Sequence, residues 1–219
     1  MSKVLKNNIQ NTWKKKEFSF LKRLNTPAKI QDFLEKIPFN FEKNGIDTIK
    51  SPIRTFRENN AHCFEGALLG AYILSLHGFP SLLLHLKVTG GDMDHVIAPF
   101  KINGYWGALS KTNHAVLRYR EPVYKNIREL VMSYFHEYFL DNGQKTLRQY
   151  SKVLNLNIFE KDWVTDSEDL WGIDEELDNI AHYDVLPKNL VSKKVSKKIS
   201  LRKADRVEIL ASRIEQYKK

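Results

Sequence analysis

The sequence has very little cysteine, with Cys63 as its single instance among 219 residues. One cysteine excludes a disulfide within the chain, which fits a reducing compartment, and we therefore expect a cytoplasmic protein. Long apolar runs are also missing. The longest apolar stretch, 66–86, is interrupted by His77, Gly78 and Pro80, so no membrane-spanning segment is predicted. No apolar segment follows the lysines near the start, and a signal peptide is not predicted either.

Positive charge is scarce in the middle of the chain and concentrated at its ends. Residues 1–24 carry seven Lys or Arg against one Glu, and residues 188–219 carry eleven against three acidic residues. The stretch 25–187 is net acidic, with 17 basic and 22 acidic residues. A nucleic-acid-binding protein needs a basic face on its folded body, so this function is not expected. We predict a basic N-terminal arm (1–24), one α+β domain (25–187) and a basic C-terminal extension (188–219) whose helix could bind a protein partner.

Within 25–187, three helices are expected from apolar periodicity and capping signals. A short helix begins at Thr26–Pro27 and ends before Pro38. A second helix covers 61–76 and is apolar on nearly all sides, which indicates that it is buried. A third, amphipathic helix is expected over 124–140. The acidic stretch 160–184 reads as loop-rich and held on the body by its tryptophans.

Three strands are expected after the buried helix, at 81–88, 95–102 and 105–112. Asn103–Gly104 is a typical two-residue hairpin turn between the last two. Pro99 inside the middle strand predicts a bulge or a missing partner on one side. The fold class is therefore α+β: a buried helix on a small antiparallel sheet, with additional helices around it.

The expected helix and strands place a cysteine and a histidine in positions typical of a nucleophile and its base. Cys63 lies in the first turn of the buried helix, and His95 opens the middle strand. Unpaired N–H groups and partial positive charge at a helix start favour thiolate over thiol, whose ordinary pKa is about 8.5. The same N–H groups can bind an oxyanion. Cys63 as nucleophile and His95 as its base are the candidate catalytic pair.

Hairpin register locates a third candidate. With a two-residue turn at 103–104, His95 lies opposite Thr112, and Ser110 is its diagonal neighbour on the same face. Ser110 is therefore the first candidate for orienting the imidazole. Thr112 is the second, and Asn113 the third if a bulge shifts the register.

This order of features resembles the transglutaminase-like superfamily of papain-fold cysteine enzymes. The residues that carry the resemblance are Cys63 within Cys-Phe-Glu-Gly-Ala-Leu-Leu, Gly78 after the helix, His95, and Trp106 four residues before Ser110. It covers about 55–115, and the stretch 61–138 is similar to an uncharacterised bacterial branch of the superfamily. Members usually have Asp where Ser110 stands. A hydroxyl can still fix the histidine tautomer, but it does not stabilise the imidazolium by charge.

The resemblance implies amide chemistry on a peptide or protein: hydrolysis, or acyl transfer to an amine through a thioester. We expect a thiol-dependent amidase, peptidase or acyl transferase with Cys63, His95 and Ser110 as catalytic residues and with no cofactor and no metal. Trp106 is a core residue or a wall of the substrate cleft. The alternative function is an inactive scaffold of the same fold that binds a protein partner.

Two further residues beside the cysteine have more than one interpretation. His62 reads as a cap or surface residue in preference to a second base. Glu65 either complements the helix start or opposes thiolate formation.

Overall fold

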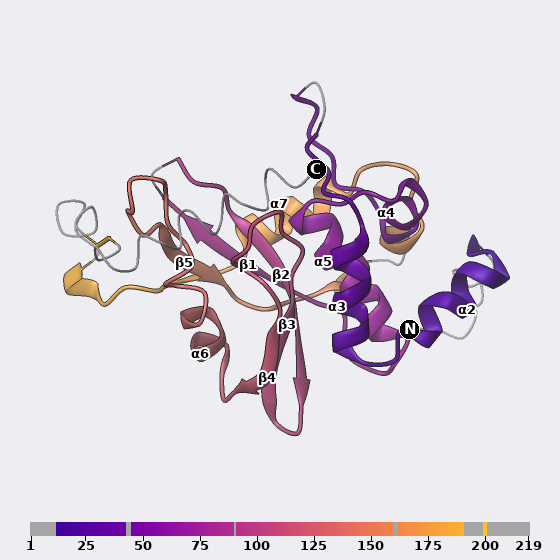
Figure 1. Cartoon of the computed structure of the whole chain (residues 1–219), viewed down its shortest axis with the longest axis horizontal. Coiled ribbons are helices and arrows are strands. Elements are labelled where there is room, and N and C mark those ends of the chain that lie inside the picture. Colours follow the sequence, from indigo (N-terminus) through magenta and orange to yellow (C-terminus); the bar gives the residue numbers. More distant parts are fainter. Residues whose placement is uncertain (1–11, 43–44, 90, 160–161, 191–198, 201–219) are drawn as a thin grey trace.

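The structure, a computed structural model, describes residues 12–42, 45–89, 91–159, 162–190 and 199–200. In these residues one antiparallel sheet of seven strands is accompanied by six α-helices (Figure 1). The mixed α+β class is as expected, but the sheet is more than twice the size of the three strands predicted. The helices are α2 (Lys15–Arg23), α3 (Pro27–Lys36), α4 (Pro52–Glu58), α5 (Cys63–Ser75), α6 (Ile127–Met132) and α7 (Trp171–Asn179).

The sheet has the order β4-β3-β2-β1-β5-β7, and β6 pairs with β1 off this path. Three of its strands correspond to the predicted ones, although the strand expected over 105–112 ends at Leu109 and Thr112 therefore does not pair with His95. The other four join them from later in the chain. The strands are β1 (Leu82–Val88), β2 (His95–Ile102), β3 (Tyr105–Leu109), β4 (Arg120–Tyr124), β5 (Leu147–Ser151), β6 (Leu154–Asn155) and β7 (His182–Asp184).

The β2–β3 hairpin has the predicted register, from Ile102 opposite Tyr105 to Ala98 opposite Leu109. Asn103 and Gly104 both have positive φ, at 50° and 88°, as a two-residue hairpin turn requires. The missing partner expected at Pro99 is also found. Pairing of β2 with β1 ends at Ile97, before the proline.

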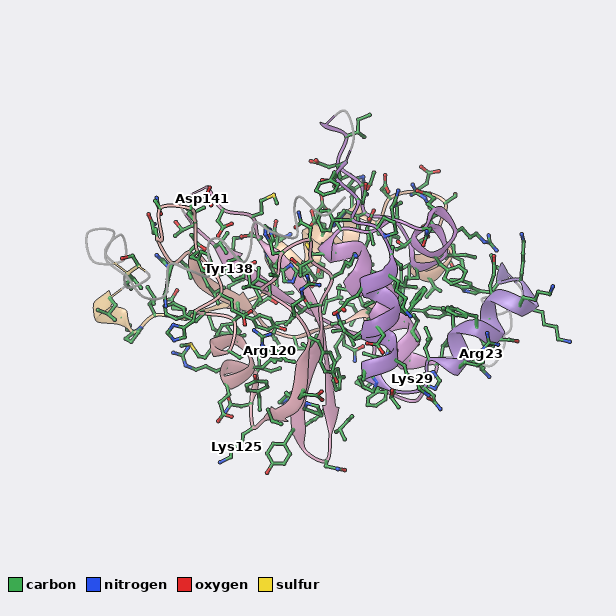
Figure 2. The ribbon with its side chains drawn as sticks, viewed as in Figure 1. Arg23, Lys29, Arg120, Lys125, Tyr138 and Asp141 are labelled. Atoms are coloured by element: carbon green, nitrogen blue, oxygen red, sulfur yellow. The ribbon has the colours of Figure 1, made fainter. Side chains whose placement is uncertain are left out.

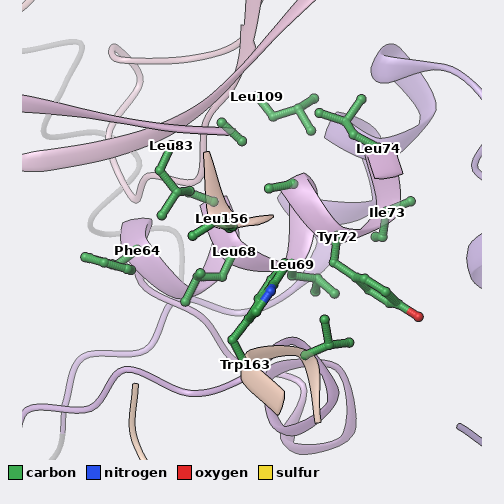
Figure 3. Close-up of a cluster of buried hydrophobic side chains, with 14 of the residues drawn as sticks. Phe64, Leu68, Leu69, Tyr72, Ile73, Leu74, Leu83, Leu109, Leu156 and Trp163 are labelled. Atoms are coloured by element: carbon green, nitrogen blue, oxygen red, sulfur yellow. The ribbon is translucent and has the colours of Figure 1, made fainter. Parts of the chain in front are cut away.

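Each face of the sheet carries its own core. Alternate residues of β2 (Val96, Ala98 and Phe100) pack with α3 and α5 on one face, whereas Ile97 packs with α6 on the other. Helix α5 is buried along most of its length, from Phe64 to Leu74. Figure 3 shows its apolar side chains between the sheet and Trp163. The helix that begins with Cys63 is thus fixed on all sides.

Helix α5 comes unusually close to the chain that leaves β3. A Cβ atom on Gly66 would lie 2.3 Å from Lys111 Cβ, and one on Gly70 would lie 2.9 Å from Leu109 Cδ1. Only glycine at position 66 lets residues 109–111 lie this close to the helix, whereas the flexible end of Leu109 can give way at Gly70. Ser110 therefore lies beside α5, near the first turn of the helix.

Two sequence predictions in the second half of the chain are wrong. The expected helix over 124–140 is replaced by the end of β4 and the six-residue α6. The acidic stretch 160–184 contains α7 and β7 instead of mainly loops. Its Trp163 is buried in the core as expected, but Trp171 is 46% exposed.

Residues 12–24, the part of the predicted N-terminal arm that the structure describes, pack on the core. Trp13 is 3% exposed and stacks on Tyr72 of α5, with ring centroids 5.6 Å apart. Leu21 of α2 is fully buried. The helix predicted within 188–219 falls outside the described residues. None of the described helices is long and apolar enough to cross a membrane.

Candidate active site

Cys63 is the first residue of α5, as the sequence predicted, and His62 is the N-cap. The Nδ1 atom of His62 accepts a hydrogen bond from the Phe64 N–H at 3.2 Å, and its Nε2 donates to the Thr48 carbonyl at 2.6 Å. The capping role expected for His62 is thus observed. With the ring held at both nitrogens, the position of the Cys63 backbone at the helix start is fixed.

Glu65 completes the cap from inside the helix. Its fully buried carboxylate accepts hydrogen bonds from the His62 N–H at 3.0 Å and the Thr48 hydroxyl at 2.9 Å. The Lys50 N–H at 3.3 Å and the Asn40 amide at 3.2 Å add to these. A buried carboxylate with this many donors is satisfied where it lies. Of the two interpretations open for Glu65, the structure supports stabilisation of the helix start.

His95 lies at the head of β2 and contacts Ser110 beyond the end of β3. Its Nε2 is 2.8 Å from Ser110 Oγ. The Ser110 hydroxyl also makes a short hydrogen bond to the Leu117 carbonyl, which can only accept. The single hydroxyl proton is used there, so Ser110 Oγ must accept from His95 Nε2–H. The ring is thereby held in the tautomer whose unprotonated nitrogen is Nδ1.

The cysteine and the two histidines interact directly. Burial raises the pKa of the Cys63 thiol, but hydrogen bonds and positive charge from His62 and His95 outweigh it and bring that pKa to about 5. Since Nε2 of His95 is engaged by Ser110, Nδ1 is the nitrogen available to the sulfur. At neutral pH this arrangement favours the thiolate form of Cys63.

His62 has a second property besides capping. Burial lowers the pKa of its imidazole, but contact with the Cys63 sulfur and the charge of Glu65 raise it to about 9. A proton on Nδ1 would replace the cap bond from the Phe64 N–H with a contact to the thiolate. His62 is therefore a second source of positive charge for the sulfur.

The loop before β2 is tied down next to His95. Asp94 accepts hydrogen bonds from His85 Nε2 at 3.0 Å and from the Val88 N–H at 2.7 Å. Burial raises the pKa of this carboxyl, but the hydrogen bond from His85 outweighs it, and the pKa lies below its usual range. Asp94 therefore stays ionised and anchors the start of the strand that carries His95.

Cys63 lies in the wall of two pockets. The larger has a volume of about 480 Å³ and lies on the His95 side, where Thr112, Asn113 and Tyr138 also line it. The smaller has a volume of about 230 Å³ and lies on the His62 side. One wall of the smaller pocket is apolar and consists of Ile49, Phe64, Val96 and Trp171. The other wall is acidic and consists of Glu42, Asp47, Asp94, Asp174 and Asp178. A substrate therefore has space on both sides of the sulfur.

The other site residues predicted from the sequence, Thr112, Asn113 and Trp106, differ in their position relative to Cys63 and His95. Thr112 and Asn113 share the larger pocket with His95, but it is Ser110 that accepts the hydrogen bond from the imidazole. Trp106 lines neither pocket and instead lies under Lys101, whose Nζ is 5.2 Å from the ring centroid. Among the described residues no group of three or more His, Cys, Asp or Glu could hold a metal ion.

Several residues of the site are absent from the sequence prediction. Gln31 contacts the backbone of Ser110, Lys111 donates from its Nζ to the Ile37 carbonyl, and the buried Tyr138 lines the larger pocket. Gln31 is a polar residue within the apolar periodicity of its helix, which is the one signal that could have revealed it. The other two come from segments whose position depends on distant parts of the chain.

Comparisons with known proteins give a limited likeness. No protein-family model matches the chain, and no curated protein matches it. Calcium-bound LapG from Legionella pneumophila is similar in structure, with 18% identity and a TM-score of 0.34 over 49% of this chain and 60% of that one. EGTA-treated LapG matches with 18% identity and a TM-score of 0.32. The chain thus spans about 60% of the length of these structures.

Proposed function

We propose that this chain is a thiol-dependent amidase, peptidase or acyl transferase with a transglutaminase-like fold. The observation that carries the proposal is the chain of hydrogen bonds from the Leu117 carbonyl through Ser110 to His95, whose imidazole helps to lower the pKa of Cys63. It supports an orientation of the base in which Nδ1 faces the sulfur, and a nucleophile and base in this relation are the requirement for thiol catalysis.

In the proposed mechanism the Cys63 thiolate attacks the carbonyl carbon of a peptide or protein amide. Backbone N–H groups of the first turn of α5 stabilise the negative oxygen of the tetrahedral intermediate. The His95 imidazolium then gives its Nδ1 proton to the leaving amine, and the C–N bond breaks to leave a thioester. Water or a second amine attacks the thioester with His95 as base, and the thiol returns. Hydrolysis and transfer differ only in this last nucleophile.

Ser110 has a defined part in this mechanism. Its oxygen accepts from Nε2–H when the imidazole is neutral and also when it is charged, so the ring does not rotate between steps. A carboxylate in this position would add charge stabilisation, and Ser110 supplies none. The thiolate compensates, because a cysteine is a much stronger acid than a serine and needs less help from its base.

The first test is the pH dependence of Cys63 alkylation by iodoacetamide, followed by mass spectrometry. We expect the rate to be constant between pH 6 and 8 and to fall by half near pH 5, because only the thiolate reacts. The variant His95→Ala is expected to move the midpoint upward. Labelling that begins only above pH 8, or only on denaturation, would contradict the proposal and favour an inactive scaffold.

The second test addresses the reaction itself. A pool of synthetic peptides is incubated with the protein, with and without a primary amine, and new termini are identified by mass spectrometry. Products that are absent with Cys63→Ala establish catalysis by the thiol. Free carboxyl ends indicate hydrolysis, and amides formed with the added amine indicate transfer.

A further inference from the structure

Gln31 is a buried amide on the helix that faces the end of β3. It lies in α3 between Ile30 and the other apolar residues of the helix, and it is only 4% exposed. A buried amide costs free energy unless its donors and acceptor are all used. Its hydrogen bonds therefore show what holds it there.

All of these hydrogen bonds involve Ser110 or a neighbour on the same helix. Gln31 Oε1 accepts from the Ser110 N–H at 3.0 Å, and Gln31 Nε2 donates to the Ser110 carbonyl at 2.8 Å. The second N–H of the amide donates to Glu35 Oε1 at 3.0 Å. Both partners of Nε2 are acceptors and the partner of Oε1 is a donor, so the orientation of the amide is determined.

This contact replaces a β-strand partner. Strand β3 ends at Leu109, and Ser110 is the first residue beyond it. The side-chain amide of Gln31 offers one donor and one acceptor to the Ser110 backbone, as a neighbouring strand would. Lys111 is tied to the same helix end through the Ile37 carbonyl. Residues 110 and 111 are thus held between α3 and α5.

We propose that Gln31 is a positioning residue that holds Ser110 Oγ against His95 Nε2 and so sets the orientation of the base toward Cys63. The inference rests on the proposed function, because it assigns a role within the same site. Without the amide, the buried N–H and C=O of Ser110 lose their partners and the segment must move to satisfy them. The imidazolium then loses the acceptor for its Nε2–H, and the thiolate loses the cation that stabilises it.

The test is the iodoacetamide pH profile of Gln31→Met, which keeps the length of the side chain but has no amide. We expect the labelling midpoint to rise by about one pH unit, which makes labelling at pH 5 about fivefold slower. Ser110→Ala is expected to give the same shift, and the double variant Gln31→Met/Ser110→Ala no more than Ser110→Ala alone. A residue with a merely structural role would not give this non-additivity.

Two further variants separate positioning from loss of stability. Leu21→Ala removes a fully buried side chain from α2, far along the chain from Ser110, and is expected to lower the melting temperature without moving the midpoint. Gln31→Glu keeps the acceptor but removes the N–H donor to the Ser110 carbonyl, and is expected to shift the midpoint upward like Gln31→Met.

The outcomes are distinguishable. A low midpoint in the natural protein that neither Gln31 variant moves would overturn this inference and leave the proposed function in place. An equal shift in Leu21→Ala would overturn it too, because the effect would then follow stability. Labelling of the natural protein only above pH 8 would overturn the proposed function itself.

Discussion

At the scale of single residues, two imidazoles in different situations lower the pKa of Cys63. His95 is held by Ser110 in one tautomer. His62 is adjacent in sequence and caps the helix through Nδ1 while its ring is neutral. Burial lowers the pKa of this ring, but the sulfur and Glu65 raise it to about 9, and the protonated ring contacts the sulfur in place of the cap. The two rings approach the sulfur from the sides of different pockets, so they can be tested separately.

The variant His62→Asn tests the contribution of the second imidazole. Asparagine is as good an N-cap as any residue, so stability should change by less than about 1 kcal/mol. The loss of a positive charge beside the thiolate is expected to raise the pKa of Cys63, which the iodoacetamide profile measures. His77→Asn, just beyond the other end of α5, is the control. An unchanged profile in His62→Asn would limit His62 to capping.

At the scale of elements, the close approach of α5 to residues 109–111 requires Gly66. An added methyl group would lie 2.3 Å from Lys111 Cβ, which is not a flexible side-chain end. Gly66→Ala is therefore expected to reduce the free energy of unfolding by about 1–3 kcal/mol. It should also raise the labelling midpoint of Cys63, because Ser110 is displaced with Lys111.

Gly172 in α7 is the matched control. A Cβ atom there would meet nothing within 4 Å. Gly172→Ala is expected to leave the labelling profile unchanged and to raise the free energy of unfolding slightly, by about 0.5 kcal/mol, because alanine favours the helix. Chemical denaturation measures both variants, and equal stability of the two would contradict the packing argument.

The same elements show what the sequence reveals and where it stops. Helix α5, the β2–β3 hairpin and the contact of His95 with Ser110 follow from signals that are local: a helix start, a glycine stop, and an Asn-Gly turn that sets the register. Strand β5 pairs with β1, and β7 pairs with β5, although these strands are far apart in the sequence. No local sequence signal predicts such pairing. The expected helix over 124–140 is shortened to α6 for the same reason, since Tyr124 at its start pairs with β3 and Phe139 near its end forms a bridge with Lys145.

The contact between Gln31 and Ser110 shows the same limit at the site. It joins residues 79 positions apart, and the polar Gln31 on the apolar face of its helix is a local signal that does not identify the partner. The exposure of Trp171 could not be predicted from the sequence either, because a tryptophan beside acidic residues is compatible with a buried position and with an exposed one.

At the scale of the whole molecule, the charge on the described body is unevenly placed. Acidic residues line both pockets beside Cys63. Figure 2 shows Tyr138 and Asp141, from the larger pocket, well apart from Arg23 and Lys29 near the start of the chain. Burial raises the pKa of Asp174, and the neighbouring charge of Asp178 adds to the effect. Carboxylates this close together repel one another and any anion that enters.

This field predicts discrimination between reagents of different charge. Replacing Asp174 and Asp178 with asparagine is expected to raise the rate of Cys63 alkylation by iodoacetate relative to iodoacetamide, by roughly twofold per charge at low salt. The gain should shrink in 0.5 M salt, where the Debye length is about 4 Å. Glu121→Gln, on the exposed strand β4, is the control. Equal ratios in all three proteins would show that the pocket charges do not act at the sulfur.

The segment 12–23 is a structural part of the body. Trp13 stacks on Tyr72 and meets Phe56 edge-on at 5.5 Å. Trp13→Ala is expected to lower the free energy of unfolding by about 3 kcal/mol, as for other buried large side chains. Lys16→Ala, at an exposed position of α2, should have no measurable effect. Thermal unfolding compares them, and equal melting temperatures would contradict the docking of this segment.

The order of contacts around Ser110 also has a consequence for the newly made chain. The acceptor for the Ser110 hydroxyl is the carbonyl of Leu117, so the arrangement that ionises Cys63 is complete only after translation has passed that residue. On the ribosome, and again whenever the molecule unfolds, Cys63 is an ordinary thiol with a pKa of about 8.5. Its reaction with a small alkylating reagent at pH 6 therefore serves as a chemical gauge of how many molecules in a sample are correctly folded.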